Sequence, residues 1–326
     1  MTSPVYDPFA SARPPGVTTI DLIDARRERR FPCELWYPSE SGGRDAQGFP
    51  GTYPLVVFSH YSGGNRRASS FLCEHLAARG YVVAAIDHSE VVARELRAAA
   101  GEDEAARAVR IRGWIEARVP DLRLLLDHLL GSGRLPVRVA GNAVGAVGHS
   151  FGGWTVLEAA VTDDRIASIV ALAPAGGGNP RPGILPVTAS LRWQRDLPVL
   201  YVAAKNDSSI SLESIEELRR RTASARMVVL TDADHLHFVD DVELRHEGVR
   251  VMTLGPELAW LKNAMRPIGE LLPGAQAHRL VRGYALAHFD ATLKALPEAA
   301  AFWNLFEGEC GNRGKEIRRR DRRLGE

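Results

Sequence analysis

A serine set between glycines near the middle of the chain has the residue types and spacing of a catalytic nucleophile. Residues 148–153 read GHSFGG and fit the pattern G-x-S-x-G. An apolar run at 144–147 precedes this segment, and a helix-like stretch at 154–160 follows it. A strand, a tight turn with a serine at its tip and a helix form a nucleophile elbow, whose strained backbone has no room for side chains beside the serine. Ser150 is therefore the predicted nucleophile, and a glycine-rich surface turn is the alternative.

Acyl transfer through a serine also needs a base, a carboxylate that orients the base and donors for the oxyanion. Asp207 is the predicted acid because it lies in the segment KNDSS, directly after the apolar run 197–203. Loops at the C-terminal ends of parallel strands meet at one edge of the sheet, so this loop is expected beside the serine. The alternative is an aspartate that caps the helix predicted at 212–221.

The predicted base is His235, which follows the last apolar strand in the segment DADHLHF. His237 is its rival, because both imidazoles would lie on one side of an extended segment. The His-x-His pair, with Asp240 and Asp241 nearby, also has the spacing of metal ligands. No further histidine or cysteine cluster accompanies it, so no metal and no other cofactor is predicted.

Two backbone N–H groups are predicted to hold the oxyanion. One follows the nucleophile and belongs to Phe151. The other is expected from the loop HYSGG, after the apolar strand 53–59, and by position it belongs to Ser62. An ordinary glycine-rich turn is the alternative interpretation of this loop.

Strands and helices that alternate along the chain are expected to position these residues. This order predicts an α/β fold with a mostly parallel central sheet, helices on both faces and a small rim of helix and loop. Strands are expected at 17–23, 31–37, 53–59, 81–87, 144–147, 166–172, 197–203 and 227–230, and helices at 67–79, 154–160, 212–221 and 276–296.

A further helix is expected to start at Asp121, which follows Pro120 and would act as its N-cap. Gly131 would end it, and its apolar face would consist of Leu122, Leu125, Leu126 and Leu129. The charged, alanine-rich stretch 89–119 before it is interpreted as a helical insertion, and the loop 174–195, rich in glycine and proline, as part of a substrate rim.

Composition is consistent with one large domain. The 326 residues are 45% hydrophobic and carry a net charge of +1, which gives no overall attraction to nucleic acid or to an anionic membrane. The predicted organisation is an N-terminal arm at 1–16, one domain at 17–297 and a basic tail at 298–326. The three cysteines have no C-x-x-C spacing, and the sequence shows no apolar leader and no apolar run long enough to span a membrane, so we expect a cytoplasmic protein. Its expected partner is a small-molecule substrate. A homodimer is an alternative to a monomer that the sequence does not decide.

The motifs together resemble the α/β-hydrolases. The closest likeness is to the dienelactone-hydrolase-like and platelet-activating-factor-acetylhydrolase-like branch, with polyester hydrolases and cutinases of the same fold close behind. It rests on residues 55–88 (LVVFSHYSGG through LAARGYVVAAIDH), the GHSFGG, AAKNDSS and DADHLHF segments, and the early strand RFPCELWYP. It covers about residues 17–297. The resemblance implies the same site residues, with Ser150 as nucleophile, Asp207 as acid and His235 as base. The implied oxyanion donors are the N–H groups of Ser62 and Phe151.

Two positions depart from that branch. The family usually has His-Gly where this chain has His60-Tyr61, so Tyr61 is expected to narrow the acyl pocket. Acetylhydrolases of the platelet-activating-factor type keep their acid after the strand that follows the elbow, where this chain has Ala173. This difference favours Asp207 as the acid, as in polyester hydrolases.

The predicted function is hydrolysis of a carboxylic ester or lactone through an acyl-enzyme on Ser150. An acyltransferase of the same fold and a binding protein without turnover are the alternatives. A third alternative is a tail that binds nucleic acid, since residues 318–323 read RRRDRR. Interspersed acids and a lack of aromatic residues favour a solvated end instead.

Overall fold

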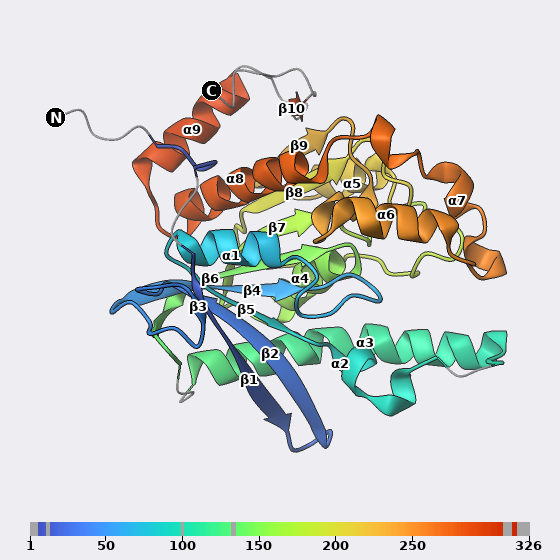
Figure 1. Ribbon diagram of the computed structural model, residues 1–326, viewed down its shortest axis with the longest axis horizontal. Coiled ribbons are helices and arrows are strands. Elements are labelled where there is room, and N and C mark those ends of the chain that lie inside the picture. The colour runs from blue at the N-terminus through green and yellow to red at the C-terminus, as the bar shows by residue number, and fades with distance from the viewer. Residues whose placement is uncertain (1–5, 11–13, 99–100, 132–134, 309–314, 318–326) are drawn as a thin grey trace.

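The computed structural model describes residues 6–10, 14–98, 101–131, 135–308 and 315–317 (Figure 1). Within these ranges the strands form one ten-stranded sheet in the order β10-β9-β8-β7-β6-β4-β5-β2-β1-β3. Their bounds are β1 Gly16–Asp24, β2 Arg29–Tyr37, β3 Gly43–Arg44, β4 Thr52–Ser59, β5 Val82–Ile86, β6 Arg138–His149, β7 Ile166–Leu172, β8 Val199–Ala204, β9 Ala225–Leu230 and β10 Lys315–Ile317.

The central strands β5, β4, β6, β7, β8 and β9 run parallel to their neighbours, whereas β2 is antiparallel to both β1 and β5. Parallel strands buried on both faces are expected to be continuously apolar. Residues 82–86 (VVAAI) and 199–204 (VLYVAA) are indeed buried throughout. The predicted mostly parallel sheet is therefore confirmed.

Helices cover both faces of the sheet (Figure 1). Helices α1 and α8 contact each other on one face, and α3 and α4 contact each other on the other. The helix bounds are α1 Ser70–Ala78, α2 Ser89–Val92, α3 Glu104–Leu130, α4 Phe151–Thr162, α5 Leu212–Arg220, α6 Val242–Val251, α7 Leu261–Ala264, α8 Gly274–Thr292 and α9 Pro297–Gly308. Short 3-10 turns are η1 Arg94–Leu96, η2 His235–Phe238, η3 Pro256–Leu258 and η4 Ile268–Glu270.

The prediction that a helix starts at Asp121 is wrong. Helix α3 runs without a break from Glu104 through Pro120, and its N-cap is Asp103, whose side chain accepts a hydrogen bond from the N–H of Ala106. Asp121 is fully buried inside the helix and accepts hydrogen bonds from Arg27 and Ser89 instead. The predicted leucine face is buried, and Gly131 is the C-cap. Packing of this face against the core outweighs the cost of an internal proline.

Helix α1 starts three residues later than predicted, at Ser70. The carboxylate of Asp240, far away in sequence, accepts hydrogen bonds from the N–H groups of Ser70 and Phe71 at 2.8 and 3.0 Å. These are orphan donors of the first helical turn, so a distant residue fixes the position of this N-terminus.

Residues 297–308, where the sequence predicts the start of a basic tail, form the amphipathic helix α9. Trp303 of this helix is fully buried, and its ring lies 5.9 Å from the ring of Tyr284 on α8. Most of the basic segment beyond it lies outside the described residues, as does Cys310. Among the described helices, none is both long and apolar enough to cross a membrane.

Candidate active site

Ser150 lies at the sharp turn between β6 and α4. Its backbone has φ 57° and ψ −116°, a conformation that residues other than glycine rarely adopt. A Cβ atom on Gly148 would approach the carbonyl oxygen of Gly152 to 2.0 Å, and a Cβ on Gly152 would approach that of Ser59 to 2.0 Å. Both glycines are therefore required by close backbone contacts, as the sequence predicts for a nucleophile elbow.

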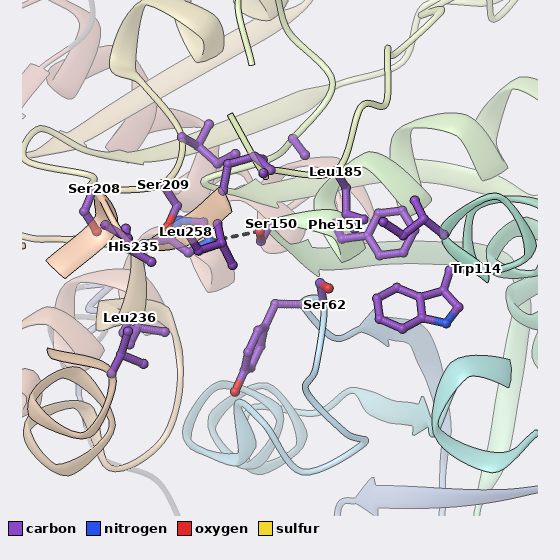
Figure 2. A pocket seen from close by; sticks show the side chains of 18 of the residues that line it. Ser62, Trp114, Ser150, Phe151, Leu185, Ser208, Ser209, His235, Leu236 and Leu258 are labelled. Carbon is purple, nitrogen blue, oxygen red and sulfur yellow. Dashed lines mark hydrogen bonds between the residues drawn. The ribbon is translucent and has the colours of Figure 1, made fainter. Parts of the chain in front are cut away.

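The structure brings Ser150, His235 and Asp207 together in one hydrogen-bonded row. His235 Nε2 lies 2.9 Å from Ser150 Oγ, a contact drawn as a dashed line in Figure 2. His235 Nδ1 lies 2.8 Å from Asp207 Oδ2. All three residues come from loops or turns at the C-terminal ends of parallel strands, which explains how residues 85 positions apart meet.

Asp207 is oriented by the loop that follows β8. Its Oδ1 accepts hydrogen bonds from the N–H groups of Ser209 and Ile210 at 2.8 and 2.7 Å, which leaves Oδ2 for the histidine. Helix α5 is capped by Ser211, so the helix-capping interpretation of Asp207 is wrong. Asp234 has a different task, because its Oδ1 accepts hydrogen bonds from the backbone and hydroxyl of Ser208.

The two histidines of the loop after β9 have separate roles. His235 faces the serine, whereas His237 is fully buried and its Nε2 donates a hydrogen bond to the carbonyl oxygen of Leu272 at 2.9 Å. The N–H of Asp234 donates to His237 Nδ1 in a capping box. The structure thus places the ring of His235, and not that of His237, at hydrogen-bond distance from Ser150, because η2 turns the two imidazoles apart.

The surroundings of His235 favour its charged form. Burial alone would lower the pKa of this imidazole, but the charge and the hydrogen bond of Asp207 outweigh burial and raise it above the usual 6.5. The ring of His149 lies 4.7 Å away. Burial, and then the neighbouring His235, hold the pKa of His149 well below its ordinary value, so His149 stays neutral. Asp207 is thus paired with one imidazole that gains a proton readily.

Ser62 and Phe151, the predicted oxyanion donors, lie on two sides of Ser150 and line the same cavity (Figure 2). Tyr61 also lines it, and the Tyr61 ring lies 5.4 Å from that of His149. The loop is closed by a hydrogen bond from the N–H of Gly64 to the carbonyl oxygen of Tyr61 at 3.0 Å. The roles of the two N–H groups stay a prediction.

The cavity beside Ser150 has a volume of about 350 Å³ and is mostly apolar. Helix α3 and the loop 174–195 supply one wall, and this loop is the segment interpreted from the sequence as part of a substrate rim. The other wall includes side chains from α6, η3 and α7, which are single apolar residues on short helices and carry no functional signal in the sequence. The apolar residues of both walls include Ile111, Trp114, Ile184, Leu185, Val249, Leu258, Leu261 and Met265.

The two walls are joined by an ion pair and by a hydrogen bond from Trp260 Nε1 to the carbonyl oxygen of Pro182 at 3.0 Å. Arg107 of α3 lies 2.8 Å from Glu257 of η3, and both residues belong to segments that border the cavity. Within the described residues no cluster of three or more His, Cys, Asp or Glu side chains has the arrangement of a metal site. Asp240, considered as a ligand from sequence, caps α1 instead.

Comparison with known structures identifies the fold. The ferulic acid esterase from Streptomyces cinnamoneus is similar to this chain with a TM-score of 0.64 and 24% sequence identity, over 88% of this chain and 92% of the esterase. The chain has the α/β-hydrolase fold. The resemblance expected from the sequence motifs is thereby confirmed at the level of the fold, and the elbow of this α/β-hydrolase lies where that fold carries its nucleophile.

Sequence comparison points in the same direction. Residues 37–123 match the family described as platelet-activating factor acetylhydrolase, isoform II. Platelet-activating factor acetylhydrolases of Cavia porcellus and Canis lupus familiaris are 25% and 29% identical to the chain over 225 and 230 residues. These stretches are 58% of this chain and 48% of each relative, so the chain spans about half the length of the relatives it matches.

The departure expected from the sequence resemblance is visible in the structure. Ala173 occupies the position after β7 where the sequence resemblance implies an acid, and it is fully buried with φ 39°. Its side chain has no carboxylate, and the histidine is paired with Asp207 after the next strand, β8. The expected shift of the acid by one strand therefore agrees with the geometry.

Proposed function

We propose that this α/β-hydrolase is a serine hydrolase of carboxylic esters. The observation that carries the proposal is the position of the His235 ring, with one nitrogen 2.9 Å from Ser150 Oγ and the other 2.8 Å from Asp207. A neutral imidazole in this position accepts the serine proton, and the carboxylate fixes its tautomer and stabilises its charged form.

The reaction follows from these positions. Ser150 Oγ attacks the ester carbonyl while His235 takes its proton, and a tetrahedral oxyanion forms that accepts hydrogen bonds from the N–H groups of Ser62 and Phe151. His235 then protonates the leaving alcohol. Water, activated by the same imidazole, hydrolyses the acyl-enzyme and returns the serine. Only side chains and amides of this chain are needed.

The substrate is inferred from the cavity. Apolar walls around a volume of about 350 Å³ suit a small or medium-sized uncharged ester or lactone, with its carbonyl at Ser150. The names of the similar proteins agree with ester cleavage, and acetylhydrolase activity is the more specific alternative among esters. A cytoplasmic location and a homodimer stay predictions, which cell fractionation and light scattering would check.

The proposal is tested by hydrolysis of p-nitrophenyl esters of increasing acyl length and by labelling with a fluorophosphonate probe. We expect hydrolysis and labelling in the wild type, and neither in the folded Ser150→Ala variant. Wild-type-like turnover by Ser150→Ala would overturn the serine mechanism. A wild type that takes up no probe and cleaves no ester would instead favour the non-catalytic binding protein, and partitioning of product when alcohols are added would favour the acyltransferase.

A further inference from the structure

A fully buried arginine lies beneath the active site and has no part in the reaction described above. Arg118 of α3 forms an ion pair with Glu90 of α2, and its side chain has no exposed surface. A buried charge is costly even when paired, and replacing such pairs by apolar residues is often neutral or stabilising. Stability of the fold alone therefore does not explain why an arginine is placed here.

The guanidinium contacts the loop that carries Ser62. Arg118 Nη1 donates to the carbonyl oxygen of His60 at 2.7 Å, and Nη2 donates to that of Tyr61 at 3.4 Å. The Tyr61 carbonyl also accepts hydrogen bonds from His60 Nδ1 at 2.8 Å and from the N–H of Gly64 at 3.0 Å, so Arg118 completes a set of three donors. Each peptide unit is planar and trans, so its C=O and its N–H point in opposite directions. The carbonyl of Tyr61 shares a peptide unit with the N–H of Ser62. Because the carbonyl is turned toward Arg118, this N–H is turned away from it.

The same guanidinium also contacts the second predicted donor residue. Its central carbon lies 4.2 Å from the centre of the Phe151 ring, the distance of a cation–π contact. Phe151 directly follows the nucleophile, and its N–H is the other predicted donor. One side chain thus contacts both segments that carry the predicted oxyanion donors, through the Tyr61 carbonyl and the Phe151 ring.

A further set of buried polar residues holds this part of the structure in place. Ser59 Oγ lies 2.8 Å from His88 Nε2, and His88 Nδ1 lies 3.3 Å from Asp121. These residues have the types of a catalytic triad, but all three are fully buried and no substrate reaches them. Arg118 Nη1 lies 3.3 Å from the same Ser59 hydroxyl. The end of β4 is thereby fixed to α3 directly below the loop 60–64.

We propose that Arg118, paired with Glu90, is a positioning residue that sets the directions of the Ser62 and Phe151 N–H groups. This inference rests on the proposed function, because those groups matter only if an oxyanion forms at Ser150. Loss of one oxyanion donor lowers kcat about 10²- to 10³-fold. Misdirection of both amides is therefore expected to reduce kcat with little change in KM, since the guanidinium lies outside the cavity.

The decisive variant is the double substitution Glu90→Leu with Arg118→Met, which removes both buried charges together and leaves no unpaired ion. We expect it to fold, with a Tm a few degrees below that of the wild type, because the buried carbonyl of His60 loses its donor. Its kcat for p-nitrophenyl butyrate should fall about 10²-fold while KM changes less than about threefold. The Ki of butylboronic acid, which forms a tetrahedral adduct with the serine, should weaken in proportion to kcat/KM.

Two single variants provide the controls. Arg118→Lys keeps the charge but has no planar fork to reach both carbonyls, so we expect it to lose about tenfold in kcat and to be more active than the double variant. Arg123→Met, on the same helix, replaces an arginine that is 55% exposed and contacts the carbonyl of Thr162 and the carboxylate of Asp163, neither of which borders the active site. It should keep wild-type kinetics.

Three results would overturn the inference. A folded double variant with kcat within threefold of the wild type would show that the two amides need no help from Arg118. A loss of about 10²-fold in kcat with an unchanged Ki for butylboronic acid would show that Arg118 does not act on the groups that bind the oxyanion. A double variant that does not fold would assign the pair to the fold itself. A wild type inert toward esters and fluorophosphonate would be a different failure, that of the proposed function, and this inference would fall with it.

Discussion

His237 Nε2 donates a hydrogen bond to the carbonyl oxygen of Leu272 at 2.9 Å, and this contact ties the histidine loop to the segment that leads into α8. The adjacent N–H of Leu272 donates to the carbonyl of Asp232 at 2.7 Å, so the two segments are joined twice. These two hydrogen bonds, through His237 and Asp232, fix the loop that carries His235 to the segment before α8. A residue that resembles a second candidate base in the sequence supports the first one in the structure.

The first prediction separates these two histidines. His235→Ala should lower kcat/KM for a p-nitrophenyl ester about 10⁴-fold or more, because the serine loses its base. His237→Ala should keep most of the activity but lower the free energy of unfolding by about 1–3 kcal/mol, since the buried carbonyl of Leu272 loses its donor. Urea unfolding and steady-state kinetics of both variants would check this. Equal losses of activity would contradict the assignment.

The second prediction concerns pH. Activity requires neutral His235, and Asp207 raises the pKa of His235 above the usual 6.5. The rate should therefore rise with pH through that raised pKa and be low on its acidic side. In Asp207→Asn the imidazole loses this support while burial still disfavours its charge. The acidic limb of kcat/KM should then move to lower pH, and kcat at its plateau should fall about 10⁴-fold because the tautomer is no longer fixed.

Asp232→Asn is the control for this prediction, since Asp232 lies in the same acidic loop but its contact with Leu272 is through its backbone carbonyl. We expect the wild-type pH profile and near-full activity. If Asp232→Asn or Asp234→Asn removed activity while Asp207→Asn kept it, the acid would have to be reassigned.

The parts of the site that the sequence predicts are those specified by short segments. Ser150 is marked by glycines that the elbow requires sterically, and Asp207 and His235 directly follow apolar strands. Parallel strands place such loops at one edge of the sheet, so three local signals are enough to predict one arrangement. The same reasoning cannot orient a side chain within a loop, which is why His237 is a rival of His235 in the sequence although η2 turns it away from Ser150.

The parts that the sequence does not predict depend on contacts between distant residues. Asp121 has the local pattern of an N-cap after a proline, but Arg27 and Ser89 bind its carboxylate inside a continuous helix. The cavity wall from α6 to α7 consists of single apolar residues on short helices, and no periodicity marks them. Tertiary packing decides both cases, and a single sequence carries little record of it.

The third prediction tests the elbow. Gly148→Ala places a methyl group about 2.0 Å from the carbonyl oxygen of Gly152, and backbone atoms there have no room to move. We expect a loss of stability of about 3 kcal/mol or more and little soluble enzyme. Gly178→Ala is the matched control, because no atom lies within 4 Å of the added Cβ, and its Tm should match the wild type. Thermal unfolding of both proteins would check this, and an equally stable Gly148→Ala would contradict the close contact.

The last prediction concerns Tyr61, which stands where related sequences usually have glycine. Its side chain lines the cavity beside Ser150, so removing the ring should enlarge the space for the acyl group. We expect Tyr61→Ala to raise the ratio of kcat/KM for p-nitrophenyl octanoate over butyrate about tenfold, as each methylene that gains an apolar contact contributes up to about 1 kcal/mol. Tyr53→Ala is the control, because the hydroxyl of Tyr53 contacts only the carbonyls of Phe49 and Pro50, away from the cavity. An unchanged ratio in Tyr61→Ala, with butyrate hydrolysis retained, would show that this ring does not limit acyl length.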